Sequence, residues 1–130
     1  MVEINVGAVG VAAVAAFVVS SAWYAVFAGA RASLSEAPDA GAAPPPWKVV
    51  VELVRSLVLG TVLAGLAARL DVESWGAALL FGVVTWIGFP VVLLSGSVQW
   101  EKVPWRLAAL HAGDWLLKLL LITTIVSMWR

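Results

Sequence analysis

Two long stretches of the sequence contain no charged side chain. Residues 4–30 and residues 74–100 lack Asp, Glu, Lys and Arg. Each stretch exceeds the roughly 20 residues that an α-helix needs to cross the hydrocarbon core of a bilayer. The first is preceded by the acidic Glu3 rather than by a basic segment, and it is longer than the apolar core of a secretory signal. Both stretches therefore predict retained membrane-spanning helices.

Two further apolar stretches, residues 47–68 and 104–129, are long enough to span a bilayer but carry ionisable groups in their first halves. Pro90 falls inside the third apolar stretch, where its missing N–H favours a kink. We expect residues 1–130 to form a single domain. The predicted fold is all-α, an integral membrane bundle of four transmembrane helices at about 4–28, 47–69, 75–95 and 104–129.

The connections between these helices differ in composition. A Pro/Ala-rich loop at about 31–46 follows the first helix, and shorter connections lie near 70–74 and at about 96–103. Short connections make successive helices antiparallel neighbours, and an even number of crossings places both termini on one side. Basic residues near the helix ends favour the side of the first and third loops, with Arg31, Lys48, Lys102 and Arg106 against Arg69 and Arg130. The positive-inside rule then predicts cytoplasmic loops at 31–46 and 96–103, with the termini outside.

The second and fourth helices open alike, with Pro46-Trp47-Lys48 and Pro104-Trp105-Arg106. Proline suits a first helical turn, and tryptophan with a basic residue anchors a helix at the membrane interface, so both openings can share one physical cause. The alternative is a parallel internal repeat of two hairpins related by an axis along the membrane normal.

Small residues recur every fourth position in the first two helices. Such ridges let helix backbones approach closely, which is how membrane helices associate. The ridges are Ala8, Ala12, Ala16 and Ser20 in the first helix, and Ser56, Gly60, Ala64 and Ala68 in the second. We expect them to face each other within one chain; the alternative is that one of them mediates homodimerisation.

Ionisable residues inside the fourth helix follow one face. His111, Asp114 and Lys118 stand at positions i, i+3 and i+7. A charge near the bilayer centre costs at least ~2.5–3.5 kcal/mol, so such groups turn inward and find partners. Counting along the helices places further polar groups at a similar depth. The predicted intramembrane cluster is Glu52, Arg55, His111, Asp114, Lys118, Trp23 and Tyr24.

Charge complementarity within this cluster predicts particular contacts between helices. We expect Arg55 to meet Asp114 and Glu52 to meet Lys118 or His111, with Tyr24 or Trp23 completing hydrogen bonds. The first interpretation is structural, in which the pairs fasten the second helix to the fourth. The alternative is a proton or ion relay through His111, Asp114 and Glu52.

Composition narrows the possible chemistry. The chain is 62% hydrophobic and 12% charged, has a formal net charge of zero and contains no cysteine. An ordinary soluble fold, nucleic-acid binding, disulfides and thiolate chemistry are therefore excluded. No HExxH motif, nucleophile elbow or phosphate-binding glycine loop is present, so we expect no enzyme, no bound metal and no cofactor.

The sequence also resembles a bacterial membrane family classified as domain of unknown function 1761. The segments that carry the resemblance are Asn5, Ala22-Trp23-Tyr24 with Phe27, Phe89-Pro90, and His111-Ala112-Gly113-Asp114-Trp115. The resemblance covers most of the chain except the first loop. It implies a small four-helix membrane protein and supplies no mechanism.

The function expected from these observations is that of a multi-pass component of the bacterial plasma membrane that acts without catalysis. It would be an interaction or accessory protein, or a self-associating bundle. Its partners would be the lipid bilayer, other membrane proteins or copies of itself. The alternative is a small oligomeric transporter or channel that uses the His111, Asp114 and Glu52 relay.

Overall fold

A computed structural model describes residues 3–34 and 44–129. This part of the chain is helical and contains no strand. The helical segments, in chain order, are α1 (Val6–Val26), α2 (Ala28–Leu34), α3 (Pro46–Arg69), α4 (Trp75–Trp86), the π-helical turn η1 (Ile87–Val91), α5 (Val92–Trp100) and α6 (Trp105–Met128).

Four helices are long and apolar enough to cross a membrane: Val6–Val26, Pro46–Arg69, Trp75–Trp100 and Trp105–Met128. The predicted all-α bundle of four spanning helices is confirmed. The third helix differs from the prediction at its end, because it continues past residue 95 to Trp100. The predicted loop at 31–46 also starts later, because residues 31–34 belong to α2; residues 35–43 of that loop lie outside the described part.

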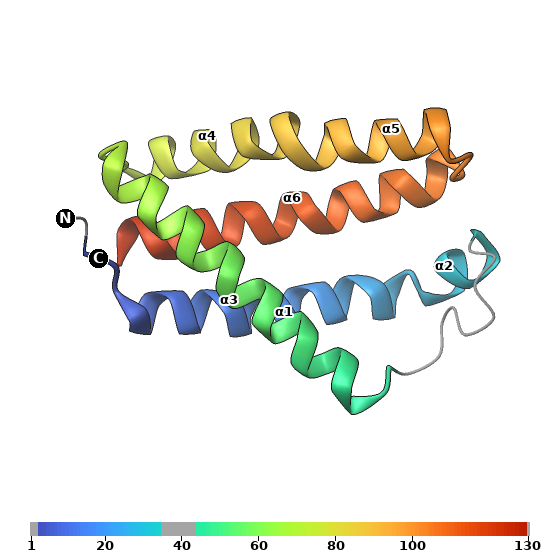
Figure 1. Ribbon diagram of the computed structural model, residues 1–130, viewed down its shortest axis with the longest axis horizontal. Coiled ribbons are helices and arrows are strands. Elements are labelled where there is room, and N and C mark those ends of the chain that lie inside the picture. Colours follow the sequence, from blue (N-terminus) through green and yellow to red (C-terminus); the bar gives the residue numbers. More distant parts are fainter. Residues whose placement is uncertain (1–2, 35–43, 130) are drawn as a thin grey trace.

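Pro90 is accommodated by the π-helical turn η1 in the middle of the third span. Proline lacks an N–H and its ring clashes with the carbonyl one α-helical turn earlier, whereas the wider π turn changes the hydrogen-bond spacing. Figure 1 shows α4 and α5 running on in one direction through this turn. The proline therefore alters the local winding without ending the span.

Local sequence sets the helix starts. The side chain of Asn5 accepts a hydrogen bond from the N–H of Ala8 at 3.1 Å, and Ser74 does the same for Ala77 at 3.1 Å. These are N-caps, which satisfy N–H groups that have no partner within the helix. Pro46 occupies the first turn of α3, where an N–H is not needed.

Two helix ends that lead into tight turns use the same backbone device. Asp71 and Lys102 both have positive φ values, of 52° and 58°. After each, an N–H reaches back to the helix: Val72 donates to the carbonyl of Ala67 at 3.0 Å, and Val103 donates to that of Ser97 at 3.2 Å. The first closure is the Schellman motif, which normally places glycine at the left-handed position, whereas the second reaches one residue further back. Each turn reverses the chain, so the two spans that the turn joins run antiparallel.

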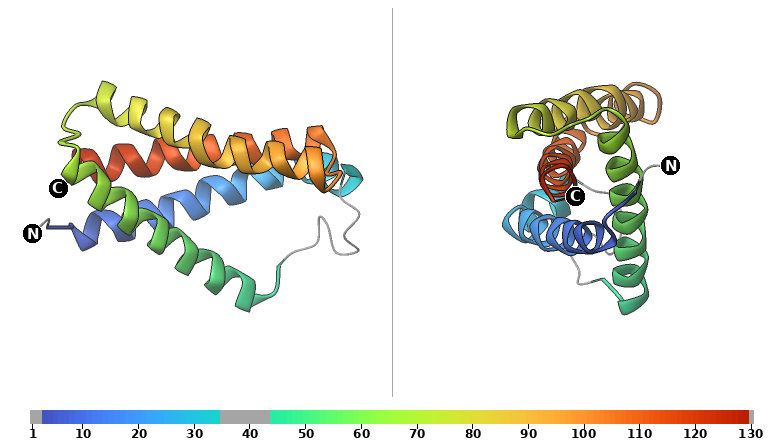
Figure 2. Two further views of the ribbon diagram at one scale, coloured as in Figure 1. Left: turned by 45° about the horizontal axis from the view of Figure 1, so that its top comes forward. Right: turned by 90° about the vertical axis from the view of Figure 1, so that its left-hand side faces the viewer.

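In the assembled bundle α6 is the central helix and packs against α1, α3 and α4 (Figure 1). The start of α1 and the end of α6 lie at the same end of the bundle, as an even number of crossings requires. Figure 2 shows that α3 crosses the others obliquely. The start of α3 diverges from α1, whereas its later turns pack closely against α1.

The close contact between α1 and α3 involves small residues. Ala8, Ala12 and Ala16 are completely buried on α1. On α3, Ser56, Gly60 and Ala64 are buried, and a Cβ added to Gly60 would lie 3.4 Å from Cγ1 of Val9. Ser20 and Ala68, at the ends of the two predicted ridges, are only half-buried. Most of both ridges is thus buried within the bundle.

The parallel-repeat hypothesis predicts equivalent contacts for α1 with α6 and for the third span with α3. The structure differs: α1 packs extensively along α6, whereas α3 and α4 scarcely touch beyond the turn that joins them. The similar openings Pro46-Trp47-Lys48 and Pro104-Trp105-Arg106 are therefore explained by interfacial anchoring. In both, the basic side chain lies over the tryptophan ring, at 5.6 Å and 5.5 Å from its centre.

Candidate functional site

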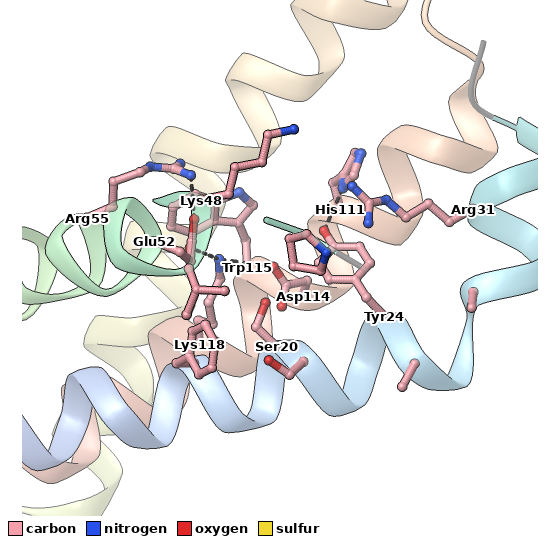
Figure 3. Close-up of a pocket in the computed structure, with 16 residues that line it drawn as sticks. Ser20, Tyr24, Arg31, Lys48, Glu52, Arg55, His111, Asp114, Trp115 and Lys118 are labelled. Carbon is pink, nitrogen blue, oxygen red and sulfur yellow. Dashed lines mark hydrogen bonds and ion pairs between the residues drawn. The ribbon is translucent and has the colours of Figure 1, made fainter. Parts of the chain in front are cut away.

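A cavity of about 690 Å³ opens at the end of the bundle where α3 diverges from α1 (Figure 3). Its walls come from the second half of α1, from α2, from the first turns of α3 and from the first half of α6. Ionisable and hydroxyl side chains line it together with a few apolar ones. The other half of the bundle has an apolar core that includes Val9, Leu63, Ile122 and Val126. Among the described residues, the buried ionisable side chains Asp114 and Lys118 thus lie in the half that contains the cavity.

Lys118 lies at the inner end of this cavity, about 20 Å along α6 from Trp105. Its ammonium is 3.0 Å from Oδ2 of Asp114 and 4.0 Å from Oε1 of Glu52. It also lies 4.1 Å from the ring centre of Trp115. The side chains of Lys118 and Asp114 are only 7% and 3% exposed, whereas Glu52 is 31% exposed. The lysine is therefore held by two carboxylates and an aromatic face, which offsets the cost of burying its charge.

Arg55 does not meet Asp114, so the predicted pair between these two residues is wrong. The guanidinium donates to Oε2 of Glu52 at 2.7 Å, and its side chain is 61% exposed. Glu52 and Arg55 are three residues apart, so they meet on the surface of one helix. Asp114 is likewise paired within its own helix, with Lys118 four residues later. The interhelical charge contact is the one between Glu52 and Lys118, which was among the expected pairs.

The hydroxyl of Tyr24 and Nδ1 of His111 form a hydrogen bond of 2.6 Å between α1 and α6. The guanidinium of Arg31 lies 4.8 Å from the ring centre of the same tyrosine. Tyr24 therefore contacts both an arginine on α2 and a histidine on α6. Figure 3 shows these three side chains grouped at one end of the cavity, with Glu52 and Arg55 at the other.

Two tryptophans fix the segment of α6 that carries His111. The indole N–H of Trp23 donates to the carbonyl of Leu110 at 3.0 Å, and that of Trp86 donates to the carbonyl of Ala112 at 2.8 Å. The two donors come from α1 and α4, so they hold α6 from both neighbouring helices. A Cβ on Gly113 would come within 2.5 Å of Cζ2 of Trp23, so the indole needs a glycine there.

One polar atom of the site has no partner. Oδ1 of Asp114 is buried without a hydrogen bond from any of the described residues. A buried carboxylate oxygen normally accepts at least one hydrogen bond, so a donor brought by a ligand or water would fit here. A metal is less well suited: residues 3–34 and 44–129 contain no group of three or more His, Asp or Glu side chains placed to hold an ion.

The structure gathers all seven residues of the predicted cluster at one end of the bundle, on the helices from which they were expected. Arg31 and Trp86 also take part, although the sequence identified them only as a helix-end charge and as a buried tryptophan. Arg31 stands seven residues after Tyr24, which is two helical turns, and this spacing is the signal that could have linked them.

One protein family has a sequence profile that matches residues 7–127, and this family is described as a protein of unknown function, DUF1761. No curated protein and no solved structure matches the chain.

Proposed function

Since the chain belongs to the DUF1761 family of unknown function, we propose from its site that it is a non-catalytic membrane component that binds a polar group in the cavity between α1, α3 and α6. Its role would be that of an interaction or accessory protein. The four apolar helices support a membrane-spanning protein, and we propose the bacterial plasma membrane, with the connection between α1 and α3 and the connection after Trp100 in the cytoplasm.

The observation that supports this function best is that the cavity stops halfway. Charged and hydroxyl groups line it down to Lys118, and beyond that point the bundle is filled by the buried side chains of Leu63, Leu119 and Ile122. An ion crossing this apolar plug would lose its hydration without gaining ligands, which costs several kcal/mol at least. A cavity closed at its inner end suits binding rather than passage.

The ion pairs support a structural role for the charged residues. Lys118, Asp114, Glu52 and Arg55 form a continuous set of contacts, so each charge lies beside an opposite one. Such an arrangement holds the start of α3 to α6 while leaving the cavity open beside it. Removal of Asp114 or of Lys118 would take the nearest opposite charge away from the other, which is buried.

Proteoliposomes that contain the purified chain and an internal pH-sensitive dye test this proposal. Wild type is expected to show no proton or ion flux above that of empty vesicles under an applied gradient. Flux that disappears in Asp114→Asn while Arg106→Gln retains it, with both variants still folded, would overturn the proposal. Arg106 is the control because it lies at the same end of the bundle but does not line the cavity.

Partners are tested by purification in mild detergent. We propose that the chain associates with lipid, with another membrane protein or with copies of itself. Light scattering coupled to size exclusion measures the mass of the protein part of the complex. A mass equal to that of one chain, with no copurifying protein, would exclude self-association and a stable protein partner.

A second candidate function is a proton or ion relay in an oligomer. The observations that favour it are the hydrogen bond between Tyr24 and His111 and, in the same cavity, Oδ1 of Asp114, which has no hydrogen-bond partner among the described residues. A hydrogen bond such as that of Tyr24 and His111 can pass a proton. Because one chain closes the path at its apolar core, a second copy would have to supply the other half. The flux experiment above decides between the two candidates.

A further inference from the structure

We infer that the inner end of the cavity binds the hydroxyl group of a lipophilic alcohol, with Oδ1 of Asp114 as the acceptor. This inference rests on the proposed function, because it treats the cavity as a binding site, and it names the chemical class of the ligand. It follows from a buried acceptor without a donor, from the pairing of the charges around it, and from the apolar walls of the same cavity.

Oδ1 of Asp114 is an acceptor that the described part of the protein leaves without a donor. The side chain lines the cavity and is only 3% exposed, and Oδ1 accepts no hydrogen bond from any residue in the described ranges. Other donors of the surrounding helices are engaged elsewhere. The hydroxyl of Tyr24 is hydrogen-bonded to His111 at 2.6 Å, and the indole of Trp23 donates to a backbone carbonyl. The ammonium of Lys118 lies at the other oxygen, Oδ2. Because a buried carboxylate oxygen normally accepts a hydrogen bond, its donor is expected from a bound molecule.

The ligand group at Oδ1 is uncharged, because the charges at the inner end are already paired. Lys118 lies 3.0 Å from Asp114 and 4.0 Å from Glu52. Glu52 in turn lies 2.7 Å from Arg55. This pairing is local to four side chains and is independent of the charges at the outer end of the cavity. A cationic group at Oδ1 would stand beside the ammonium of Lys118, and an anionic group would meet a carboxylate of the same sign. A neutral O–H or N–H donor avoids both repulsions.

A hydroxyl fits this acceptor better than a larger donor. The small exposed fraction of Asp114 leaves access for a small group only. A hydroxyl donates one hydrogen bond and can accept others, so its O–H can serve Oδ1 while its oxygen accepts from a second donor. The hydroxyl of Ser20, which lines the same cavity (Figure 3), can supply that second hydrogen bond. An amide would bring a carbonyl oxygen that needs a further donor in a buried place.

The depth of Asp114 and the walls of the cavity indicate that the hydroxyl belongs to a lipophilic molecule. Asp114 lies about 13 Å along α6 from Trp105, which is within the hydrocarbon region of a bilayer. Phe17, Val49 and Trp115 line the same cavity. A volume of about 690 Å³ is in the range of sites for whole small molecules. The cavity opens where α3 diverges from α1, which leaves room for an attached apolar chain.

Native mass spectrometry in lauryldimethylamine oxide, a detergent without hydroxyl groups, tests the assignment with three probes. These are dioctanoylglycerol, its O-methyl ether, which has the same chains without the O–H donor, and glycerol. Wild type is expected to bind dioctanoylglycerol saturably and the ether at least about tenfold more weakly, because the ether leaves Oδ1 without a donor. If glycerol binds as tightly as dioctanoylglycerol and depends equally on Asp114, the hydroxyl site stands and its source is a free polyol.

Two variants locate the site. Asp114→Asn is expected to weaken dioctanoylglycerol binding by about tenfold, because an amide oxygen is a weaker acceptor than a carboxylate. Ser20→Leu places a larger apolar side chain in the cavity and leaves Asp114 and Lys118 in place, and it is expected to weaken binding by at least about tenfold. The matched control Ser95→Leu makes the same change at an exposed position of α5 outside the cavity, and it is expected to change the dissociation constant by less than about twofold.

Equal binding of dioctanoylglycerol and its ether by wild type would overturn the inference, as would equal losses in Ser20→Leu and Ser95→Leu. These two comparisons decide the matter if Asp114→Asn does not fold. Absence of dioctanoylglycerol and glycerol binding together with absence of flux removes only this ligand assignment. Flux that depends on Asp114 removes the proposed function itself, so the two failures are distinguishable.

Discussion

The ammonium of Lys118 lies 3.0 Å from Oδ2 of Asp114, one helical turn earlier on α6, and both side chains are almost completely buried. The pair lies within one helix, so its geometry is set before any other helix packs against it. Glu52 from α3 then approaches the same ammonium at 4.0 Å. The pair within α6 thus positions the ammonium of Lys118 so that Glu52 of the neighbouring helix α3 can approach it.

Loss of one member of the Asp114–Lys118 pair should destabilise the protein more than loss of both members. Asp114→Leu or Lys118→Met alone leaves a buried charge and is expected to lower the free energy of unfolding by about 3–5 kcal/mol, whereas the double variant should lose less than either. Glu52 keeps Arg55 as its partner in all three. Reversible unfolding in mixed micelles measures the difference. A double variant less stable than both single ones would contradict the structural role.

The indole hydrogen bonds to α6 should contribute measurably to stability. Trp23→Phe and Trp86→Phe each remove one donor to a backbone carbonyl and are expected to cost about 1–2 kcal/mol. Trp100→Phe is the control, since Trp100 is 79% exposed. Melting temperatures of the three variants in the same detergent provide the comparison. Equal effects in all three would show that the two bonds contribute nothing specific.

Gly82 marks the closest approach of α4 to α6. A Cβ there would lie 2.8 Å from Oγ1 of Thr123 and 3.3 Å from Cα of Leu120, and the backbone cannot move aside cheaply. Gly82→Ala is therefore expected to destabilise by about 1–3 kcal/mol. Gly76→Ala, on the same helix with nothing within 4 Å, should leave stability unchanged or raise it by up to about 1 kcal/mol. Thermal unfolding of both variants checks the contrast, and a Gly82→Ala protein as stable as Gly76→Ala would contradict the close packing.

Lys102 adopts a backbone conformation that an L-residue with a long side chain rarely adopts. Its φ is 58°, and the left-handed region costs a non-glycine residue about 1–2 kcal/mol. Lys102→Gly is expected to stabilise the turn by roughly 0.5–1 kcal/mol after the greater freedom of glycine in the unfolded chain is counted. Glu101→Gly serves as the control because its φ of −105° offers no relief. A stability gain in the control as large as in Lys102→Gly would refute the conformational explanation.

The proposed orientation in the membrane can be determined with single introduced cysteines, because the chain contains no cysteine of its own. Ser33→Cys, Glu73→Cys and Lys102→Cys place one thiol at each exposed connection. In a bacterial host, a membrane-impermeant maleimide is expected to label Glu73→Cys in intact cells, and the other two only after permeabilisation. The inverse pattern would reverse the orientation, and labelling of Ser33→Cys and Lys102→Cys from opposite sides would contradict four crossings.

The sequence predicts the spanning helices well because charge burial in a bilayer is so costly that ionisable residues mark the helix ends. The end of the third helix was harder to predict. Gly96 reads as a loop residue, yet the chain stays helical to Trp100, because apolar surroundings leave backbone groups no partner other than the helix itself.

The membership of the polar cluster was predictable from depth along the helices, whereas its pairing was not. Glu52 with Arg55 and Asp114 with Lys118 have spacings of three and four residues, so contacts within one helix compete with contacts between helices. Which contact forms depends on where α3 diverges from α1, and only the packed bundle determines that. The contact of Arg31 with Tyr24 could not be predicted for a similar reason, since it depends on the chain staying helical beyond Phe27.

The π-helical turn at Ile87–Val91 divides the third span into two segments of different helical phase. A π turn holds one residue more than an α turn, so α5 faces its neighbours about 100° away from where an uninterrupted α-helix would place it. Deletion of a single residue between Trp86 and Val92 would restore regular α winding and leave the side chains of α5 facing α6 as before. A one-residue deletion in this segment is consequently far less disruptive than the same deletion in an uninterrupted part of a span, where every following side chain would rotate by about 100°.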